Sequence, residues 1–182
     1  INQCVTPDTL RENVPEVLTA GENYRYFNDV FQNFPAYFWA GVGVRGDAGS
    51  DWDIEAYDQD SYNLNPYPAC FGNSLAGSYG GSGVDFVMFN LNETHTPPGT
   101  YGIRPSRYSG AGSSTAEFDG GTDLIQLASN ATPGNSVSTA NWTGVLNVYD
   151  VLLTAGVTYT FDLQVGTGGS VDALLFSSNG AP

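Results

Sequence analysis

Apolar and polar residues alternate along several short stretches of this chain, and the clearest alternation covers residues 158–165. There, tyrosine, phenylalanine, leucine and valine take every second position, with threonine, aspartate and glutamine between them. A period of two places the apolar side chains on one face of a β-strand and the polar ones on the other. Turn residues precede this stretch at 154–156 and follow it at 167–170, and a further strand is expected over 171–176.

Similar stretches, separated by turn residues, occur through the first two thirds of the chain. They predict strands over residues 24–31, 37–45, 52–57, 84–91, 101–108 and 116–127. In the second of these, Gly41 and Gly43 share the face opposite the apolar residues, which indicates a bulge or the close approach of another backbone. Pro105 indicates that the strand over 101–108 is bent or lies at a sheet edge, because proline cannot donate to a β-ladder.

The strands divide the chain into one complete β-module and the opening part of a second. The complete module covers residues 24–127, a Ser/Thr/Asn-rich linker covers 128–143, and the partial module covers 144–182. Residues 1–23 form a polar lead segment, for which an extended course and a short helix over 7–18 both remain open.

The Gly-rich composition, with plentiful Thr, Val, Tyr and Phe, is typical of an all-β protein. The net charge of the chain limits the classes of molecule that it is expected to bind. The net charge is -14, with five arginines and no lysine. So acidic a chain repels phosphate backbones and anionic lipid, which argues against nucleic acid as a partner. No apolar run approaches the roughly 20 residues that a membrane helix needs, so no membrane insertion is expected.

Cysteine usage and the first residue predict a secreted or cell-surface protein. Cys4 and Cys70 are expected to form one disulfide, with two unrelated thiols as the alternative. The chain begins at Ile1 rather than methionine, which fits a mature protein whose signal peptide has been removed. Three Asn-x-Thr sequons, which carry glycan only where the producing cell glycosylates asparagine, begin at Asn92, Asn130 and Asn141.

Three sequence stretches resemble a known family. VYDVLLTAGVTYTF at 148–161 is similar to the opening strands of the bacterial pre-peptidase C-terminal domain, and GSVDALLF at 169–176 resembles its next strand. PGTYGIR at 98–104, followed by YSG at 108–110, resembles the closing hairpin of that family.

The resemblance covers residues 24–127 as one full copy and 144–178 as the first half of a second. It implies a jelly-roll-like antiparallel β-sandwich without enzymatic activity, found beside secreted proteases and other exported proteins. Some relatives bind calcium or a polymeric substrate. The first copy departs from the family pattern at 33–36 and in a long insertion at 58–82 that contains Cys70.

Acidic residues gather around the strand predicted over 52–57. Carboxylate oxygens on loops suit Ca²⁺, so a calcium site is one interpretation, and a solvated strand face is the other. The candidate calcium ligands are Asp47, Asp51, Asp53, Asp58 and Asp60. A pair of glycosidase carboxylates is a more distant interpretation of the same cluster, which also includes Glu55.

Other catalytic machinery is not evident in the sequence. It contains no G-x-S-x-G nucleophile motif, and His95 is its single histidine. Neither a catalytic triad nor a zinc site is therefore expected, and the chain is predicted not to be an enzyme and to need no cofactor other than calcium.

Aromatic residues interleaved with asparagine mark the long loop at 58–82. Flat aromatic faces beside hydrogen-bonding amides suit contact with a sugar or a peptide, and the alternative is that they cover an open end of the sandwich. The candidate contact residues are Tyr62, Tyr67, Phe71 and Tyr79, with Tyr57 next to them.

The partial module leaves an apolar strand face without a partner, because two or three strands cannot bury it alone. The exposed residues expected there are Val151, Tyr159, Phe161 and Val165. The chain is then a fragment, or these strands join the first module, or they pair with another copy, head to tail, and build filaments. The leading hypothesis is a non-catalytic extracellular protein that self-associates or adheres; the alternative is a module of a secreted hydrolase that binds polysaccharide or protein.

Overall fold

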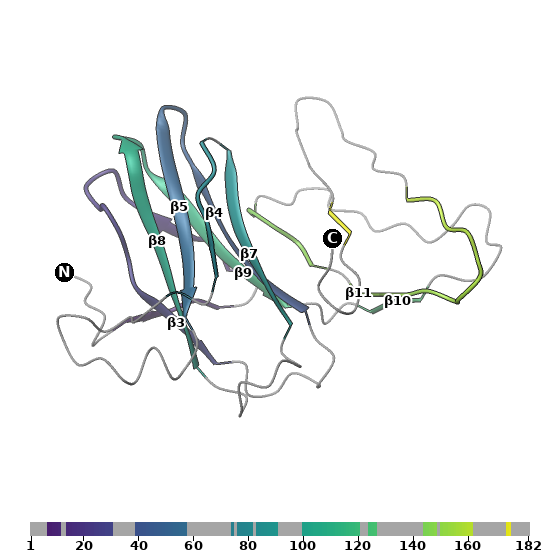
Figure 1. Cartoon of the computed structure of the whole chain (residues 1–182). Coiled ribbons are helices and arrows are strands. Elements are labelled where there is room, and N and C mark those ends of the chain that lie inside the picture. Colours follow the sequence, from purple (N-terminus) through teal and green to yellow (C-terminus); the bar gives the residue numbers. More distant parts are fainter. Residues whose placement is uncertain are drawn as a thin grey trace.

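The computed structural model shows a β-sandwich and, beyond one end of it, a smaller pair of strands (Figure 1). The structure describes residues 7–11, 14–30, 39–57, 74, 76–81, 83–90, 100–120, 124–126, 144–148, 150–161 and 174–175. Strands, turns and irregular segments make up these residues, and they contain no helix.

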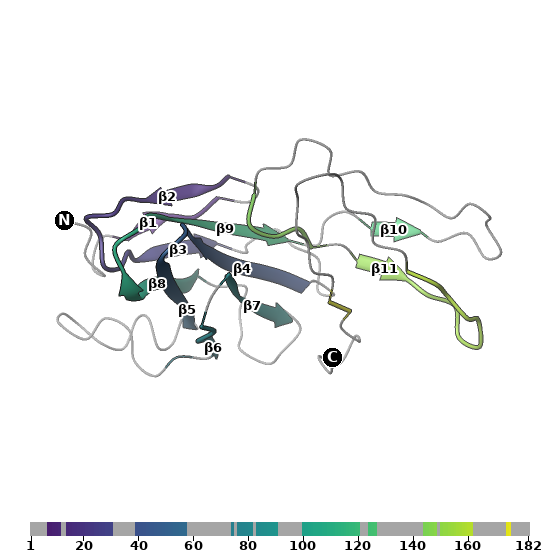
Figure 2. The ribbon, with the colours of Figure 1, turned by 90° about the horizontal axis from the view of Figure 1, so that it is seen from above.

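Two sheets form the layers of the sandwich (Figure 2). The five-stranded sheet has, in spatial order, β1 (Asp8–Thr9), β3 (Phe27–Val30), β8 (Thr100–Gly110), β5 (Ser50–Tyr57) and β6 (Ala76–Ser78). The four-stranded sheet has β2 (Glu16–Leu18), β9 (Ser114–Gly120), β4 (Trp39–Gly46) and β7 (Val84–Asn90). Outside these layers, β10 (Leu124–Gln126) pairs in parallel with β11 (Asp150–Leu152).

The strand pairs of the sandwich are nested in the chain, as in a jelly roll. The pairs β2–β9 and β4–β7 lie in one sheet, and β3–β8 and β5–β6 lie in the other. All four are antiparallel, and the chain alternates between the sheets as the nesting requires. This topology confirms the predicted all-β, jelly-roll-like antiparallel sandwich.

The core lies between the two sheets and is formed by every second residue of their strands. Val42 and Val44 of β4, with Phe118 of β9, face Trp52 and Ile54 of β5, and all of them are buried. Burial of one such side chain contributes about 1.5–3 kcal/mol, so this interlayer contact is the main source of the sandwich's stability.

Four strands lie where the sequence predicts them, to within two residues at each end: β4, β5, β7 and β8. The expectation of an edge position at Pro105 is wrong, because β8 is the central strand of its sheet. The carbonyl of Pro105 accepts from the N–H of Arg25, before β3 begins at Phe27. The missing proline donor therefore falls outside the regular β3–β8 ladder.

The lead segment adds a strand to each sheet. A helix over 7–18 does not form in the described residues, where β1 pairs in parallel with β3 and β2 pairs antiparallel with β9. Leu10 and Leu18 are fully buried in the core. Their burial outweighs the weak helix signal of a segment that contains Pro15.

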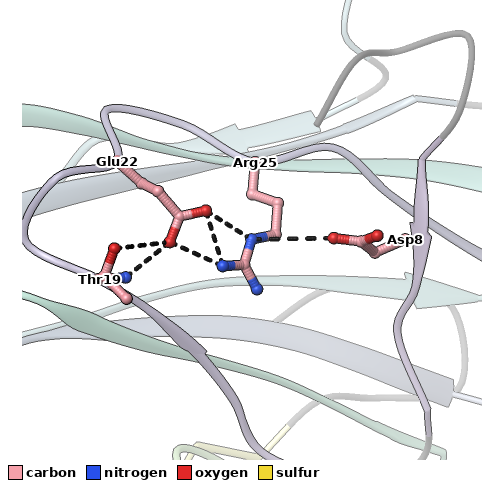
Figure 3. Close-up of polar contacts among 4 residues, drawn as sticks. All are labelled: Asp8, Thr19, Glu22 and Arg25. Carbon is pink, nitrogen blue, oxygen red and sulfur yellow. Dashed lines mark hydrogen bonds and ion pairs between the residues drawn. The ribbon is translucent and has the colours of Figure 1, made fainter. Parts of the chain in front are cut away.

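Four polar residues anchor this lead segment to the sandwich (Figure 3). Both carboxylate oxygens of Glu22 accept from the Arg25 guanidinium, at 2.6–2.9 Å, and one of them also accepts from the backbone N–H and hydroxyl of Thr19. Asp8 lies on the other side of Arg25, 3.9 Å from its Nε. The cluster joins β1, the end of β2 and the approach to β3.

Residues 144–148, here called the strap, cross the outer face of the four-stranded sheet. A Cβ added at Gly43 would lie 2.6 Å from Leu146 Cδ2, and one at Gly41 would lie 3.0 Å from Leu146 Cδ1. The sequence predicted a bulge or the close approach of another backbone at these two glycines; the strap instead approaches them with the side chains of Val145, Leu146 and Val148. A side chain at either position would displace the strap.

The strand predicted over 158–165 is absent from its described part. Residues 157–161 are irregular, and Phe161 is 51% exposed. An alternating pattern fits a pleated strand only where a neighbouring strand supplies hydrogen bonds, and none does so at these residues.

We predict that Glu22→Gln destabilises the protein by about 1 kcal/mol near neutral pH. Burial raises the Glu22 pKa, but the hydrogen bonds from Arg25 and Thr19 outweigh it and hold the pKa below its usual value of 4.5. The ionised Glu22 carboxylate therefore contributes its full share of the folding stability above pH 4.5, and this share is lost as the pH falls through the folded-state pKa of Glu22. Urea unfolding at several pH values measures it; a difference that grows on acidification would contradict the prediction.

Candidate functional site

The outer face of the five-stranded sheet carries a cluster of tyrosines around one ion pair. We call it the tyrosine face and define it by six residues: Tyr24, Tyr26, Glu55, Tyr57, Tyr79 and Arg104. Strand alternation produces it, because Trp52, Ile54 and Ala56 point into the core and Glu55 therefore points outward. In register, Glu55 lies opposite Arg104 of β8 on one side and Gly77 of β6 on the other.

Glu55 is the centre of the tyrosine face. Its carboxylate accepts from the hydroxyl of Tyr57 at 2.8 Å and from the hydroxyl of Tyr79 at 2.9 Å. It also accepts from Nη2 of Arg104, whose guanidinium carbon lies 5.8 Å from the centre of the Tyr57 ring. Three donors from three strands or their ends thus meet at one carboxylate.

The absence of a side chain at Gly77 allows Tyr79 to reach Glu55. A Cβ at Gly77 would lie 2.5 Å from the Tyr79 hydroxyl oxygen and 2.6 Å from its Cζ. The tyrosine therefore lies across β6 instead of pointing away from the sheet, and 62% of its surface remains exposed.

Tyr24 and Tyr26 extend the face along the other side of β8. Their ring centres are 5.4 Å apart with planes at 64°, an edge-to-face arrangement. Tyr24 pairs with Ser106 by an isolated bridge and is 48% exposed, and Tyr26 makes a hydrogen bond with Arg104. Exposed aromatic surface thus lies on both sides of the Glu55–Arg104 pair.

The contacts at Glu55 shift the pKa values of Glu55, Tyr57 and Tyr79 away from neutral pH. Burial raises the pKa of Glu55, but the hydroxyls of Tyr57 and Tyr79 and the charge of Arg104 lower it by more, so the net shift is downward. Burial and the hydrogen bond donated to Glu55 both raise the pKa of Tyr57 and of Tyr79. At neutral pH Glu55 is therefore charged and paired with Arg104, and Tyr57 and Tyr79 keep the hydroxyl protons that they donate to it.

The candidate calcium ligands are only partly described. Among the described residues, no group of three or more Asp, Glu, His or Cys is arranged to hold a metal ion. Burial raises the Asp53 pKa, and so does repulsion from the charges of Asp85, Asp51 and Glu55. Asp58 and Asp60 lie outside the described residues, so the calcium site remains a prediction.

Most other predicted site residues also lie outside the part of the chain that the structure describes. They are Cys4, Cys70, Tyr62, Tyr67, Phe71, Asn92, Asn130, Asn141 and Val165. His95, for which no site is predicted, lies outside the described residues too. Three of the candidate self-association residues are described. Val151 lies in β11, and Phe161 is exposed. The hydroxyl of Tyr159 accepts a hydrogen bond from the backbone N–H of Thr154.

Sequence reasoning found Tyr79 and named Tyr57 and Glu55, but it missed Tyr24, Tyr26 and Arg104. The available signal was the i, i+2 spacing of the two tyrosines, which places them on one face of the strand predicted over 24–31. Without the register of β8 against its neighbours, nothing in the sequence placed Arg104 opposite Glu55.

Comparison with known proteins finds similarity among solved structures. No family model and no curated protein matches the chain. Among solved structures, the pre-peptidase C-terminal domain of a collagenase from Bacillus anthracis is similar, with 14% identity and a TM-score of 0.40 over 58% of this chain and 86% of that one. The assignment of a jelly-roll sandwich rests on the strand topology of this chain itself.

No helix long and apolar enough to cross a membrane occurs among the residues placed by the structure.

We predict that Arg104→Met destabilises the protein by about 1–3 kcal/mol, because the largely buried Glu55 carboxylate loses its cationic partner. Glu55→Gln and the double variant complete a double-mutant cycle. The double variant is expected to lose less stability than the two single losses added together. Strict additivity in chemical unfolding would show that the pair is not coupled.

Proposed function

We propose that this chain is a non-catalytic extracellular module that binds a neutral polysaccharide on the tyrosine face. The observation that carries the proposal is the exposed aromatic surface of Tyr24 and Tyr79 on either side of the Glu55–Arg104 pair. Sugar rings have apolar faces that stack on aromatic rings and hydroxyl groups that bond to fixed polar neighbours.

Charge supports a neutral ligand over an anionic one. The net charge of the chain is -14, and the one arginine in the tyrosine face is already paired with Glu55. An anionic polymer would therefore meet repulsion without a free cation to hold it. The alternative ligand of the same module, an extended protein chain, would depend on free backbone groups of a strand edge instead of on aromatic rings.

Self-association is a second candidate function, favoured by exposed apolar residues near the C-terminus. Leu153, Val157 and Phe161 are each more than a third exposed, as are Leu174 and Leu175. Exposed apolar side chains favour contact with a partner where they form a contiguous surface patch. Assembly into filaments by strand sharing remains a prediction within this second function.

We predict that the purified protein is retained by an insoluble neutral polysaccharide in a panel that includes cellulose, chitin and starch. Tyr79→Ala and Tyr24→Ala should each weaken retention about tenfold, because each removes one stacking ring. Tyr79→Phe keeps the ring and should bind more tightly than Tyr79→Ala. The matched control is Val17→Ala, an exposed residue on the opposite sheet.

Two results would count against this proposal. One is a wild-type chain that no neutral polysaccharide retains. The other is retention that Tyr24→Ala and Tyr79→Ala leave unchanged, which would place the binding surface elsewhere.

We predict that the wild-type chain forms species larger than a monomer, and that Phe161→Asp shifts it toward the monomer. A charge at this exposed apolar position would be costly to bury in an interface. Size-exclusion chromatography with light scattering over a range of concentrations measures this, with Val17→Asp as the control. A wild-type monomer at every concentration would remove the second function.

A further inference from the structure

The strap lies in a groove that the four-stranded sheet provides on its outer face. Gly41 and Gly43 of β4 form the floor, and the thioether of Met88 borders it from β7, 2.9 Å from a Cβ built at Gly41. On the other side, Glu117 and Asp119 of β9 stand opposite these glycines in register. Both carboxylates are nearly fully buried, at 2% and 4% exposure.

The strap satisfies these carboxylates with its backbone. The N–H of Val145 donates to Glu117, and the N–H of Val148 donates to Asp119 at 2.5 Å. Arg45 donates to the carbonyl of Gly144 at 3.3 Å. Buried carboxylates are costly without such donors, so an occupied groove is more stable than an empty one.

The groove selects its occupant by shape and by hydrogen bonds. The occupant must place apolar side chains over two glycines and must offer backbone donors three residues apart. The sequence of the strap, GVLNV, meets these needs through Leu146, whose two methyl carbons lie over Gly41 and Gly43. An identical strap from a second copy meets them equally well.

The connection to the strap does not restrict it to its own chain. Residues 127–143 separate β10 from the strap, and fully extended they span roughly 55 Å at about 3.3 Å per residue. Directly after the strap and β11 come the exposed apolar residues Leu153, Val157 and Phe161.

We propose that two copies of this chain exchange straps, so that residues 144–148 of each copy fill the groove of the other. β11 follows the strap, and its pairing with β10 is exchanged as well. The proposal rests on self-association, the second function given above, and names the contact that mediates it.

Complementary variants of the full chain test the exchange. Gly43→Val blocks the groove, because a Cβ at position 43 would lie 2.6 Å from Leu146 Cδ2. The strap of this variant is unchanged. Leu146→Asp disables the strap but keeps the groove. Each variant carries a different affinity tag, and the two are unfolded and refolded together. The expected product is a 1:1 complex in which the strap of the first variant fills the groove of the second.

The control replaces the first variant by a chain that carries both substitutions and therefore offers no strap; it should form no complex with Leu146→Asp. Both single changes lie outside the core, and thermal unfolding checks that each variant folds. Refolding two differently tagged wild-type chains together provides a measurement that needs no variant. Exchange predicts that they copurify and that Leu146→Asp in both chains abolishes the copurification.

The outcomes separate the two claims. Wild-type oligomers that persist in Leu146→Asp, with no complex between the complementary variants, overturn strap exchange and leave self-association standing. A wild-type chain that stays monomeric and forms no mixed complex overturns both.

Discussion

The packing of β4 on both of its faces is the constraint on which the rest of the structure depends. Val42 and Val44 enter the core, and the glycines between them lie under the strap. A strand covered on both sides has no solvent face, and glycine at two of its outward positions leaves the space that the side chains of the strap occupy. The sequence AGVGV provides this arrangement, and it fixes where the two sheets meet and where the C-terminal part of the chain attaches.

The two outer faces of the sandwich differ because their central strands carry different residues. On the four-stranded sheet, glycines leave a groove that hydrophobic side chains of the strap fill. On the five-stranded sheet, Glu55 and Arg104 face each other across β5 and β8, and tyrosines surround them. The largely buried Glu55 carboxylate is satisfied there by Arg104 and by the hydroxyls of Tyr57 and Tyr79, while the rings of Tyr24 and Tyr79 remain partly exposed.

The sequence predicted the strands that contribute most of the core, because alternation and burial agree in them: β4 and β5 are the clearest cases. At Gly41 and Gly43 it indicated a bulge or the close approach of another backbone, and the structure places side chains of the strap there instead. It failed where tertiary contacts decide. Leu10 and Leu18 of the lead segment are buried because the sheets end beside them, and Pro105 is tolerated because β3 starts beyond it. Of the tyrosine face, Tyr79 was predictable from composition, but Arg104 depended on strand register.

The strap also explains why the C-terminal alternation did not produce a strand in its described part. Alternation of apolar and polar residues predicts which side chains share a face. A strand also needs a neighbouring backbone with free hydrogen-bond donors and acceptors. Residues 144–148 find side-chain acceptors in Glu117 and Asp119, and β11 finds β10. Residues 157–161 have neither a side-chain acceptor of this kind nor a neighbouring strand among the described residues, and Val157 and Phe161 stay exposed. The same physical rule that orders the first module therefore leaves, in the described part of the second, a surface that another chain can complete.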